Sequence, residues 1–388
     1  GFLIYLLEKP RVNAVVKTCC RHVARLNPNP TGVSLKRRTR QRFWAMVKMF
    51  WILCALVTFM TIFRSREPFH ILDRKVLRRE RMFKQKQGMM YMEEHNAAHA
   101  VDLTDHIGLP IPAVYEHLRE VDDLPFDVDI DVPFFWHIPR TGGTTTNDVL
   151  GACLELSLAA NSGGKNHESD QELKVMELGS KQIKYVNVDT SSPGGIEHAR
   201  EMSLASSGLA DVVLCSRVYH ATEQIFTMDN RGRMFAFFRH PVERAVSLFH
   251  FTQDTIWRRK GDITDELANI SILNYFKGGM GEENWMTRFL TNERTKLLNE
   301  QDFKVAKEIL RRKCLVGLLN RKHESMERFM RYFGWAVNGD EEQECLDKHM
   351  NWAWPLKHRH PEVEEGSEVW NAIQSLNQWD LKLYEYAK

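Results

Sequence analysis

One fourteen-residue stretch combines arginine, glycine and threonine in a pattern that suits an anion. "HIPRTGGTTTNDVL", residues 137–150, follows the apolar run "VPFFW" directly. Gly142 and Gly143 let the backbone approach a ligand closely and turn several N–H groups toward it. Arg140 adds a permanent forked cation, and the threonines add hydroxyls. The stretch predicts a loop that holds a phosphate or sulfate group. A tight strand-to-helix turn is the alternative, but it would not explain Arg140.

A second stretch also contains side chains that could bind an anion, together with this loop. "FAFFRHPVERAVSLFHF" places Arg239 at the end of an apolar run and Ser247 eight residues later, in the next predicted helix. The two stretches resemble the 5′-phosphosulfate loop and the 3′-phosphate-binding element of sulfotransferases, in the same order. The resemblance is closest to the Golgi carbohydrate sulfotransferases, such as the heparan sulfate O-sulfotransferases. It covers residues 132–388.

The resemblance implies a co-substrate and the residues that hold it. Members of that family bind 3′-phosphoadenosine-5′-phosphosulfate (PAPS) on a P-loop-like α/β fold, use no metal, and sulfate a carbohydrate acceptor. Carried over to this chain, the PAPS-binding residues are Arg140, Thr141, Gly142, Gly143, Thr144, Thr145, Arg239 and Ser247. Lysine is commoner than Arg140 at its position. The planar fork of arginine should preserve binding but alters how the leaving group is stabilised.

The acceptor hydroxyl needs a base, and histidine has the side-chain pKa closest to the working pH. His220 follows a predicted strand at the same sheet edge as the two anion-binding stretches, and several relatives keep a catalytic histidine in this region. We therefore predict His220 as the catalytic base, beside Arg140; a histidine that only caps the next helix is the alternative. Glu223 is the non-histidine candidate. His137 is predicted to pack against or orient the loop, and His240 to lie too far from the sulfur.

From residue 132 onward, short apolar runs alternate with helix-like segments. The predicted strands are 132–138, 183–189, 211–216, 233–239 and 314–319, and the predicted helices are 144–158, 196–207, 221–228 and one that begins at Pro241. Continuous apolar strands separated by helices indicate an α/β fold whose parallel sheet is covered on both faces. The resemblance refines this to a P-loop-like three-layer fold. Ligands of such sheets bind beyond the carboxyl ends of the strands, where the candidate residues fall.

An apolar segment ahead of this domain predicts a membrane anchor. Residues 43–63 contain Lys48 as their only charge and are long enough to cross a bilayer as a helix. The predicted organisation is a cytoplasmic segment at 1–42, a transmembrane helix at 43–63, a stem at 64–131 and the sulfotransferase domain at 132–388. The resemblance implies a single-pass type II protein of the Golgi membrane with a luminal catalytic domain.

The charge distribution supports the anchor and argues against nucleic acid as a partner. Residues 1–90 carry 20 Lys and Arg against 4 Asp and Glu, and the remainder carries 33 against 47. A basic front half suits an anionic membrane surface. An acidic remainder does not suit a protein that coats DNA or RNA. The sequence leaves the acceptor glycan and the oligomeric state open.

Four cysteines lie in the predicted domain, and an oxidising lumen would allow them to pair. We predict a Cys314–Cys345 disulfide and buried thiols at Cys153 and Cys215, both of which have apolar neighbours. No spacing of cysteine and histidine indicates a metal site. Asn269, followed by Ile and Ser, is an acceptor sequence for glycosylation of a luminal domain.

Two other functions stay open on the sequence. A P-loop kinase-type phosphotransferase would need a Gly-Lys-Ser/Thr loop and an acidic residue for Mg²⁺ after a later strand, and neither pattern occurs. A non-catalytic relative that binds a nucleotide or a glycan is favoured by Arg140, which stands where lysine is usual. Sulfuryl transfer from PAPS to a sugar hydroxyl remains the prediction.

Overall fold

The computed structural model describes residues 109–388, apart from 124, 128, 165–166, 168–169, 255–268, 338 and 352–359. The predicted cytoplasmic segment, the predicted span at 43–63 and most of the predicted stem lie outside the described residues. Within the part of the chain that the structure describes, no helix is both long and apolar enough to cross a membrane.

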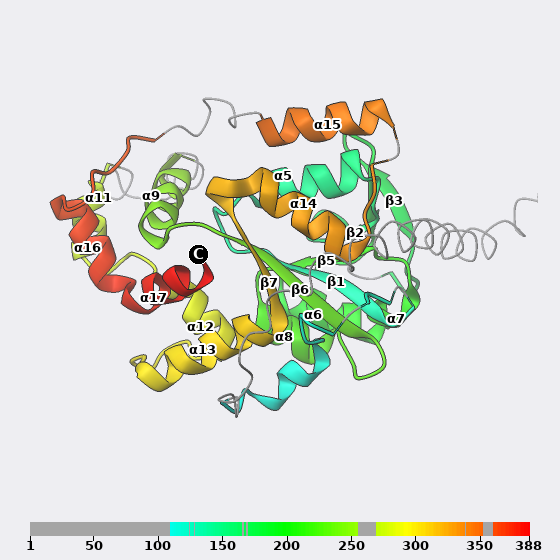
Figure 1. Cartoon of the computed structure of the whole chain (residues 1–388), viewed down its shortest axis with the longest axis horizontal. Coiled ribbons are helices and arrows are strands. Elements are labelled where there is room, and N and C mark those ends of the chain that lie inside the picture. Colours follow the sequence, from blue (N-terminus) through cyan, green and yellow to red (C-terminus); the bar gives the residue numbers. More distant parts are fainter. Residues whose placement is uncertain are drawn as a thin grey trace, which may run out of the picture. The chain divides into compact units, whose positions relative to one another are not determined.

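Seven strands form one sheet in the order β3-β4-β2-β5-β1-β6-β7 (Figure 1). They are β1 (Asp131–Trp136), β2 (Leu158–Ala159), β3 (Val175–Leu178), β4 (Ile183–Val186), β5 (Val212–Cys215), β6 (Arg231–Phe238) and β7 (Cys314–Leu318). All neighbouring strands are parallel except β3 and β4, which form an antiparallel hairpin at the edge. The five predicted strands are confirmed as β1, β4, β5, β6 and β7. The two-residue β2 and the edge strand β3 are not predicted by the sequence.

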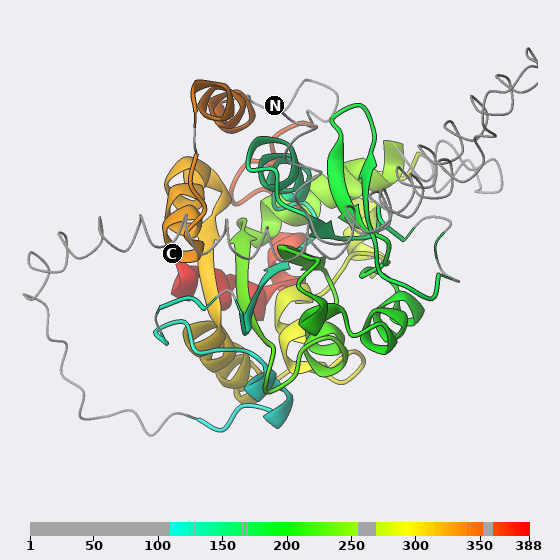
Figure 2. The ribbon, with the colours of Figure 1, turned by 90° about the vertical axis from the view of Figure 1, so that its right-hand side faces the viewer.

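Helices cover both faces of the sheet (Figure 1, Figure 2). One face packs against η1 (Ala113–His117), α6 (Pro193–Glu201), α7 (Leu204–Ser207), α8 (Val218–Gln224), α12 (Trp285–Thr291), α13 (Glu300–Lys313) and α17 (Gln378–Ala387). The other packs against α5 (Gly143–Asp148), η2 (Val149–Cys153), α14 (Lys322–Phe333) and α15 (Asp340–Asn351). A third cluster joins α9 (Pro241–Thr252), α11 (Ile272–Lys277) and α16 (Glu368–Leu376). The predicted α/β class with a largely parallel central sheet is confirmed.

Beyond their amino ends, where Asp131 and Arg233 lie, the central strands are apolar because side chains alternate between two buried faces. Every residue of β1 is buried. Phe134 and Trp136 point into the layer that contains α8, and Phe135 points into the layer that contains α14. A short continuous apolar run predicts such a strand, since neither face needs polar residues.

The order of the strands identifies one place on the carboxyl edge of the sheet where a ligand is expected to bind. The chain leaves β1 toward β2 on one side, but it leaves the adjacent strand β6 toward β7 on the other side. Open α/β sheets bind their ligands where two neighbouring crossovers diverge in this way. Arg140 follows β1 and Arg239 follows β6, so both predicted site residues stand at this switch point.

The folded unit begins before the predicted start at residue 132. Tyr115, Leu118 and Phe126 are buried. The Tyr115 hydroxyl donates to the carbonyl oxygen of Leu290 at 2.5 Å, and Leu118 forms a β-bridge with Gly232 in β6. These residues belong to the predicted stem, a stretch that is acidic and contains scattered prolines.

The helix predicted over 144–158 is too long at its end. α5 begins at Gly143 and continues into η2, a π-helical turn that ends at Cys153. Glu155 adopts a left-handed conformation with φ 51°, which a right-handed helix excludes. Leu158 and Ala159 then form β2 between β4 and β5.

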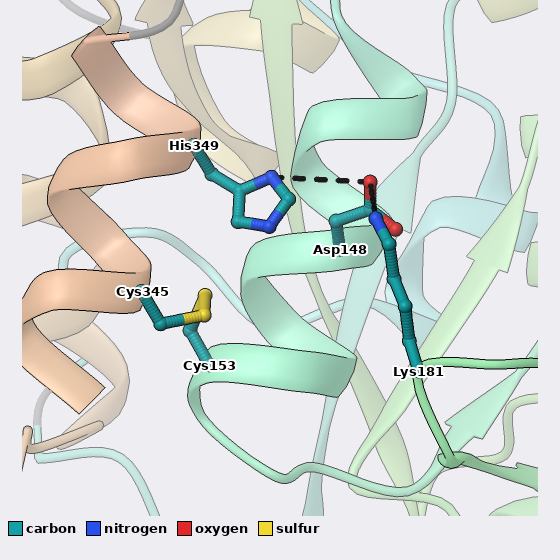
Figure 3. Close-up of a disulfide and its surroundings, with 5 residues drawn as sticks. All are labelled: Asp148, Cys153, Lys181, Cys345 and His349. Atoms are coloured by element: carbon teal, nitrogen blue, oxygen red, sulfur yellow. Dashed lines mark ion pairs between the residues drawn. A yellow bond between two sulfur atoms is a disulfide. The ribbon is translucent and has the colours of Figure 1, made fainter. Parts of the chain in front are cut away.

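A disulfide joins Cys153 to Cys345 of α15 (Figure 3). The predicted Cys314–Cys345 pair is therefore wrong, and so is the prediction of a thiol at Cys153. Cys314 begins β7 and points into the layer that contains α8, whereas α15 packs on the opposite face of the sheet. Cys215 and Cys314 are buried free thiols, and burial raises the pKa of Cys215 to about 12.

Candidate anion-binding site at the carboxyl edge of the sheet

The loop after β1 is a tight turn with two left-handed residues. Arg140 has φ 68° and Gly142 has φ 93°. A left-handed arginine costs about 1–2 kcal/mol, and such strain is concentrated at functional sites. A Cβ on Gly143 would lie 1.9 Å from Nε2 of His137, whose ring stacks on Phe135 at 5.9 Å between centroids. His137 therefore packs against the loop, as predicted, and Gly143 makes that packing possible.

The threonines of the loop divide into two groups. The Thr141 hydroxyl donates to a backbone carbonyl within the loop at 2.8 Å, and the Thr146 hydroxyl donates to another at 3.1 Å. Thr144 is exposed and Thr145 is half-buried. Neither of the latter two hydroxyls bonds to another residue that the structure describes. The side chain of Thr141 thus stabilises the loop, and those of Thr144 and Thr145 remain available to a ligand.

Three predicted site residues from distant parts of the chain meet at the switch point. Nε of Arg140 donates to the Ser247 hydroxyl at 3.1 Å across 107 residues of sequence. Nη1 of Arg239 donates to the carbonyl oxygen of Arg140 at 3.4 Å. The guanidinium carbon of Arg140 lies 4.6 Å from the centroid of the Phe251 ring. We call Arg140, Arg239 and Ser247 the Arg140 cluster.

The charges of the Arg140 cluster are incompletely neutralised. Among the described residues, Arg140 has no carboxylate partner, and Arg239 pairs at 3.2 Å with Glu243, whose side chain is 55% exposed. Burial and then the nearby Arg239 lower the pKa of the Arg140 guanidinium. Two like charges held close together in a partly buried place favour an anion between them. The cluster can therefore bind a phosphate or sulfate group, with the exposed Arg239–Glu243 pair as the only ion pair among the described residues that competes with it.

His220 lies on the neighbouring part of the same edge. The backbone N–H of His137 donates to the carbonyl oxygen of Cys215 at 3.0 Å, which joins the ends of β1 and β5. His220 stands in the first turn of α8, directly after β5. Its Nε2 is buried and has no hydrogen-bond partner in the described structure, so it can accept a proton. No contact between described residues joins His220 to the Arg140 cluster. Glu223, one turn later, is exposed.

Two further arginines at this edge are not predicted by the sequence. Arg217 follows β5, and Arg294 lies after α12. Trp136 stacks on Trp285 at 6.1 Å, Trp285 on Phe289 at 3.8 Å, and Arg294 on Phe289 at 3.5 Å. Burial and then Arg217 lower the pKa of Arg294. Neither arginine pairs with a carboxylate in the described chain, and only the fold reveals that they are neighbours.

A third arginine, also not predicted, lies on the same helix as Ser247. Arg244 is fully buried, and its Nη1 lies 2.9 Å from Oε2 of Glu282. Its Nε and Nη2 have no partner among the described residues. Residues three apart share a helix face, so Arg244 and Ser247 point in the same general direction. Burial raises the pKa of Asp380, and Arg244 partly offsets that rise.

No model of a known protein family matches this chain, and no curated protein matches it. What the site can bind, and which chemistry it can support, therefore follows from the residues that form it. Arg140 without a carboxylate partner among the described residues, Arg239 with only an exposed one, a serine hydroxyl and a glycine-containing loop can hold a doubly anionic ligand. A histidine nitrogen without a partner at the adjacent strand end can take up a proton.

Proposed function

We propose that this protein is a PAPS-dependent sulfotransferase that transfers a sulfuryl group to a hydroxyl of a carbohydrate acceptor. The contact between Arg140 and Ser247 carries the proposal. The resemblance of the sequence to carbohydrate sulfotransferases assigns Arg140 to a 5′-phosphosulfate loop and Ser247 to a 3′-phosphate element. A nucleotide with anionic groups at both positions requires these elements to be adjacent. The sheet, with its loop after a central strand, suits the P-loop-like fold of that family.

The site residues fit PAPS in a definite way. The Ser247 oxygen accepts the N–H of Arg140, which leaves the serine O–H free to donate to the 3′-phosphate. Arg239 supplies a second charge to that phosphate. The backbone N–H groups around Gly142 and Gly143, with the hydroxyls of the following threonines, hold the 5′-phosphosulfate. Arg140 stands between the two ends, so it orients both rather than acting as the point charge that a lysine would provide.

The reaction is an in-line transfer between two oxygens. The acceptor hydroxyl oxygen forms a bond to sulfur while the bond from sulfur to the phosphate oxygen breaks. Nε2 of His220 takes the hydroxyl proton, and 3′,5′-ADP leaves with the electron pair. By analogy with phosphoryl transfer, charge spreads over the oxygens of the transferred group, so donors placed in advance provide most of the catalysis.

The acceptor is proposed to approach along α8 and α12. Arg217 and Arg294 lie near each other there without carboxylate partners in the described chain, and α12 packs against the helix that carries His220. A glycan with a carboxylate or sulfate group beside the reacting hydroxyl would satisfy both arginines. The net acidity of residues 91–388 does not oppose this, because the arginines act locally.

We also propose a type II orientation in the Golgi membrane, with residues 43–63 as the anchor and the catalytic domain in the lumen. The Cys153–Cys345 disulfide supports an oxidising compartment. Glycosylation of Asn269, detected as a mass shift that a glycosidase removes, would test the orientation. A catalytic domain that is modified only by reagents confined to the cytoplasmic side of the membrane would contradict this orientation.

A non-catalytic nucleotide- or glycan-binding protein is the second candidate. Arg140 favours it, because its Nε is already bonded to Ser247 and no lysine stands in the loop to meet the leaving oxygen. A P-loop kinase-type phosphotransferase has less support, since its loop lysine is missing from the sequence.

Incubation of the full chain with sulfur-labelled PAPS and a mixture of glycans separates these candidates. We expect labelled glycan from the wild type, and loss of transfer in His220→Ala with 3′,5′-ADP binding intact. Glu223→Gln is the matched control, because it removes the other candidate base. If Glu223→Gln loses sulfuryl transfer and His220→Ala does not, Glu223 would be the catalytic base. Binding without turnover in the wild type would favour the non-catalytic protein, and the absence of binding would overturn both.

A further inference from the structure

A group of metal-ligating side chains lies at the opposite end of the helix that follows the anion-binding loop. One ligand atom each from Cys153, Cys345 and His349 lies within 4.8 Å of the others. Cys153 ends η2, and the other two lie four residues apart on α15, which places them on one face of that helix. In the oxidised protein the two sulfurs form the disulfide (Figure 3).

The surroundings of His349 resemble those of a zinc ligand. Nδ1 of its ring faces Oδ2 of Asp148 at 3.9 Å, and Asp148 pairs with Lys181 at 2.6 Å. The ring lies between this carboxylate and the two sulfurs (Figure 3). Metal-binding histidines usually present their second nitrogen to a carboxylate, which fixes the tautomer and the ring orientation. With Nδ1 toward Asp148, Nε2 is the nitrogen left for a metal.

We propose that the dithiol form of this cluster binds Zn²⁺ through Cys153, Cys345 and His349, with Asp148 as the outer partner of the histidine. Zn²⁺ favours two thiolates and an imidazole, and a water molecule completes the tetrahedron. Each thiol gives up one proton on binding, so one Zn²⁺ releases two protons and no electron moves. The dithiol is the form in which the chain is synthesised. A disulfide of a second protein or small molecule in an oxidising compartment later takes two electrons from the zinc-bound thiolates. The Cys153–Cys345 disulfide then forms, Zn²⁺ leaves, and the electron acceptor becomes two thiols by taking up two protons from solvent.

The location gives the metal a structural role. Cys153 is 1% exposed, the side chains of His349 and Asp148 are 16% and 11% exposed, and Cys345 is partly exposed, so the cluster is mostly buried but a water molecule can reach it. η2 and α15 pack against each other in one helix layer. Zinc in the dithiol form and the disulfide in the oxidised form would each hold α15 to the helix that begins at the anion-binding loop. The inference does not depend on the proposed sulfotransferase activity.

The test uses the full chain and Co²⁺ as a spectroscopic probe. A phosphine reduces the disulfide, is itself oxidised to the phosphine oxide, and contributes no thiolate. We expect the reduced wild type to bind one more equivalent of Co²⁺ than the oxidised protein, with thiolate-to-metal charge-transfer absorption that Zn²⁺ abolishes. The double variant Cys153→Ser with Cys345→Ser should lose that equivalent, which also corrects for cysteines elsewhere in the chain.

Single variants identify the histidine and its carboxylate. His349→Gln should bind Co²⁺ at least about tenfold more weakly, and Asp148→Asn about 10–100-fold more weakly. His198→Gln, on the distant helix α6, is the matched control and should behave as the wild type. Equal Co²⁺ binding by His349→Gln and His198→Gln would overturn the assignment.

Thermal unfolding keeps the proposal testable if the reduced chain is unstable. Added Zn²⁺ should raise the Tm of the reduced wild type and should leave that of reduced His349→Gln nearly unchanged, while the two oxidised proteins should unfold alike. A reduced wild type that neither shows the cobalt absorption nor gains Tm with Zn²⁺ would contradict the site.

Discussion

The two edges of the central sheet differ in how several of their arginines are paired. At the amino edge, Asp131 accepts from Arg233 at 2.8 Å and from Arg119 at 2.9 Å. Arg233, which is 3% exposed, also donates to the Tyr332 hydroxyl at 2.9 Å. Nζ of Lys313, just before β7, lies 2.8 Å from Oε1 of Glu120. These three cations are neutralised by the chain itself, whereas Arg231 at the same edge has a buried Nε without a hydrogen-bond partner among the described residues.

At the carboxyl edge, three arginines are left without such partners, although Arg239 and Arg321 each pair with a glutamate of the helix that follows. Arg140, Arg217 and Arg294 have no carboxylate partner among the described residues, and the pKa of Arg140 is lowered by burial and by Arg239. The buried Arg244 has one ion pair, while its Nε and Nη2 lack a partner. Unpaired polar groups in the interior reduce stability, so the gathering of three such arginines at the carboxyl edge favours a ligand there. This grouping supports the location of the candidate site independently of the sequence motifs.

Removal of Arg233 should give the largest effect, and it should fall on stability. Arg233→Met leaves Asp131 buried with one of its two cationic partners, so we expect the free energy of unfolding to fall by about 3 kcal/mol. Urea denaturation of the full chain measures this. Affinity of the folded protein for 3′,5′-ADP should not change. A loss below about 1 kcal/mol would mean that the amino edge is not held by its charges.

Removal of Arg140 should instead weaken nucleotide binding and leave the stability of the fold nearly unchanged. Arg140→Met removes a charge-assisted contact to the nucleotide, so we expect affinity for 3′,5′-ADP to fall about 100-fold, or roughly 2.7 kcal/mol. Stability in urea should stay the same or rise slightly, because the repulsion from Arg239 disappears. Titration calorimetry measures the affinity. A variant that binds normally but unfolds more easily would place Arg140 in the same structural class as Arg233.

Ser247 should have a smaller effect that depends on the ligand. Ser247→Ala removes one hydroxyl donor, worth about 1 kcal/mol, so affinity for 3′,5′-ADP should fall about fivefold. Affinity for 5′-AMP, which lacks the 3′-phosphate, should hardly change and serves as the control. Equal losses for the two ligands would show that Ser247 acts only by orienting Arg140.

More of the fold than of the candidate site could be predicted from the sequence. Continuous apolar runs predict β1, β5, β6 and β7 because strands buried on both faces need no polar residues. β2 has only two residues, too few for any pattern. The loop around Arg140 and the position of Ser247 are local in sequence and were predicted. Contacts of Arg294, Arg244 and Cys345 depend on which face each element packs against, and local spacing does not contain that information.

The smallest effect concerns pH. Burial lowers the pKa of His137 in the folded protein, so the unfolded chain binds more protons as the pH falls through about 6.5. Stability that is fully present above that pH should therefore decrease at lower pH. Unfolding free energies at pH 7.5 and 5.5 should differ less in His137→Gln than in the wild type. An identical difference in both proteins would assign the acid sensitivity to other groups.

The central claim is that the Arg140 cluster holds the 3′-phosphate end of a nucleotide whose 5′ end rests on the loop after β1. The most direct measurement is the affinity of the full chain for 3′,5′-ADP and for 5′-AMP, in the wild type and in Arg239→Met. We expect the wild type to bind 3′,5′-ADP at least about tenfold more tightly than 5′-AMP, and Arg239→Met to remove most of this preference. Equal affinities for the two nucleotides in the wild type would contradict it.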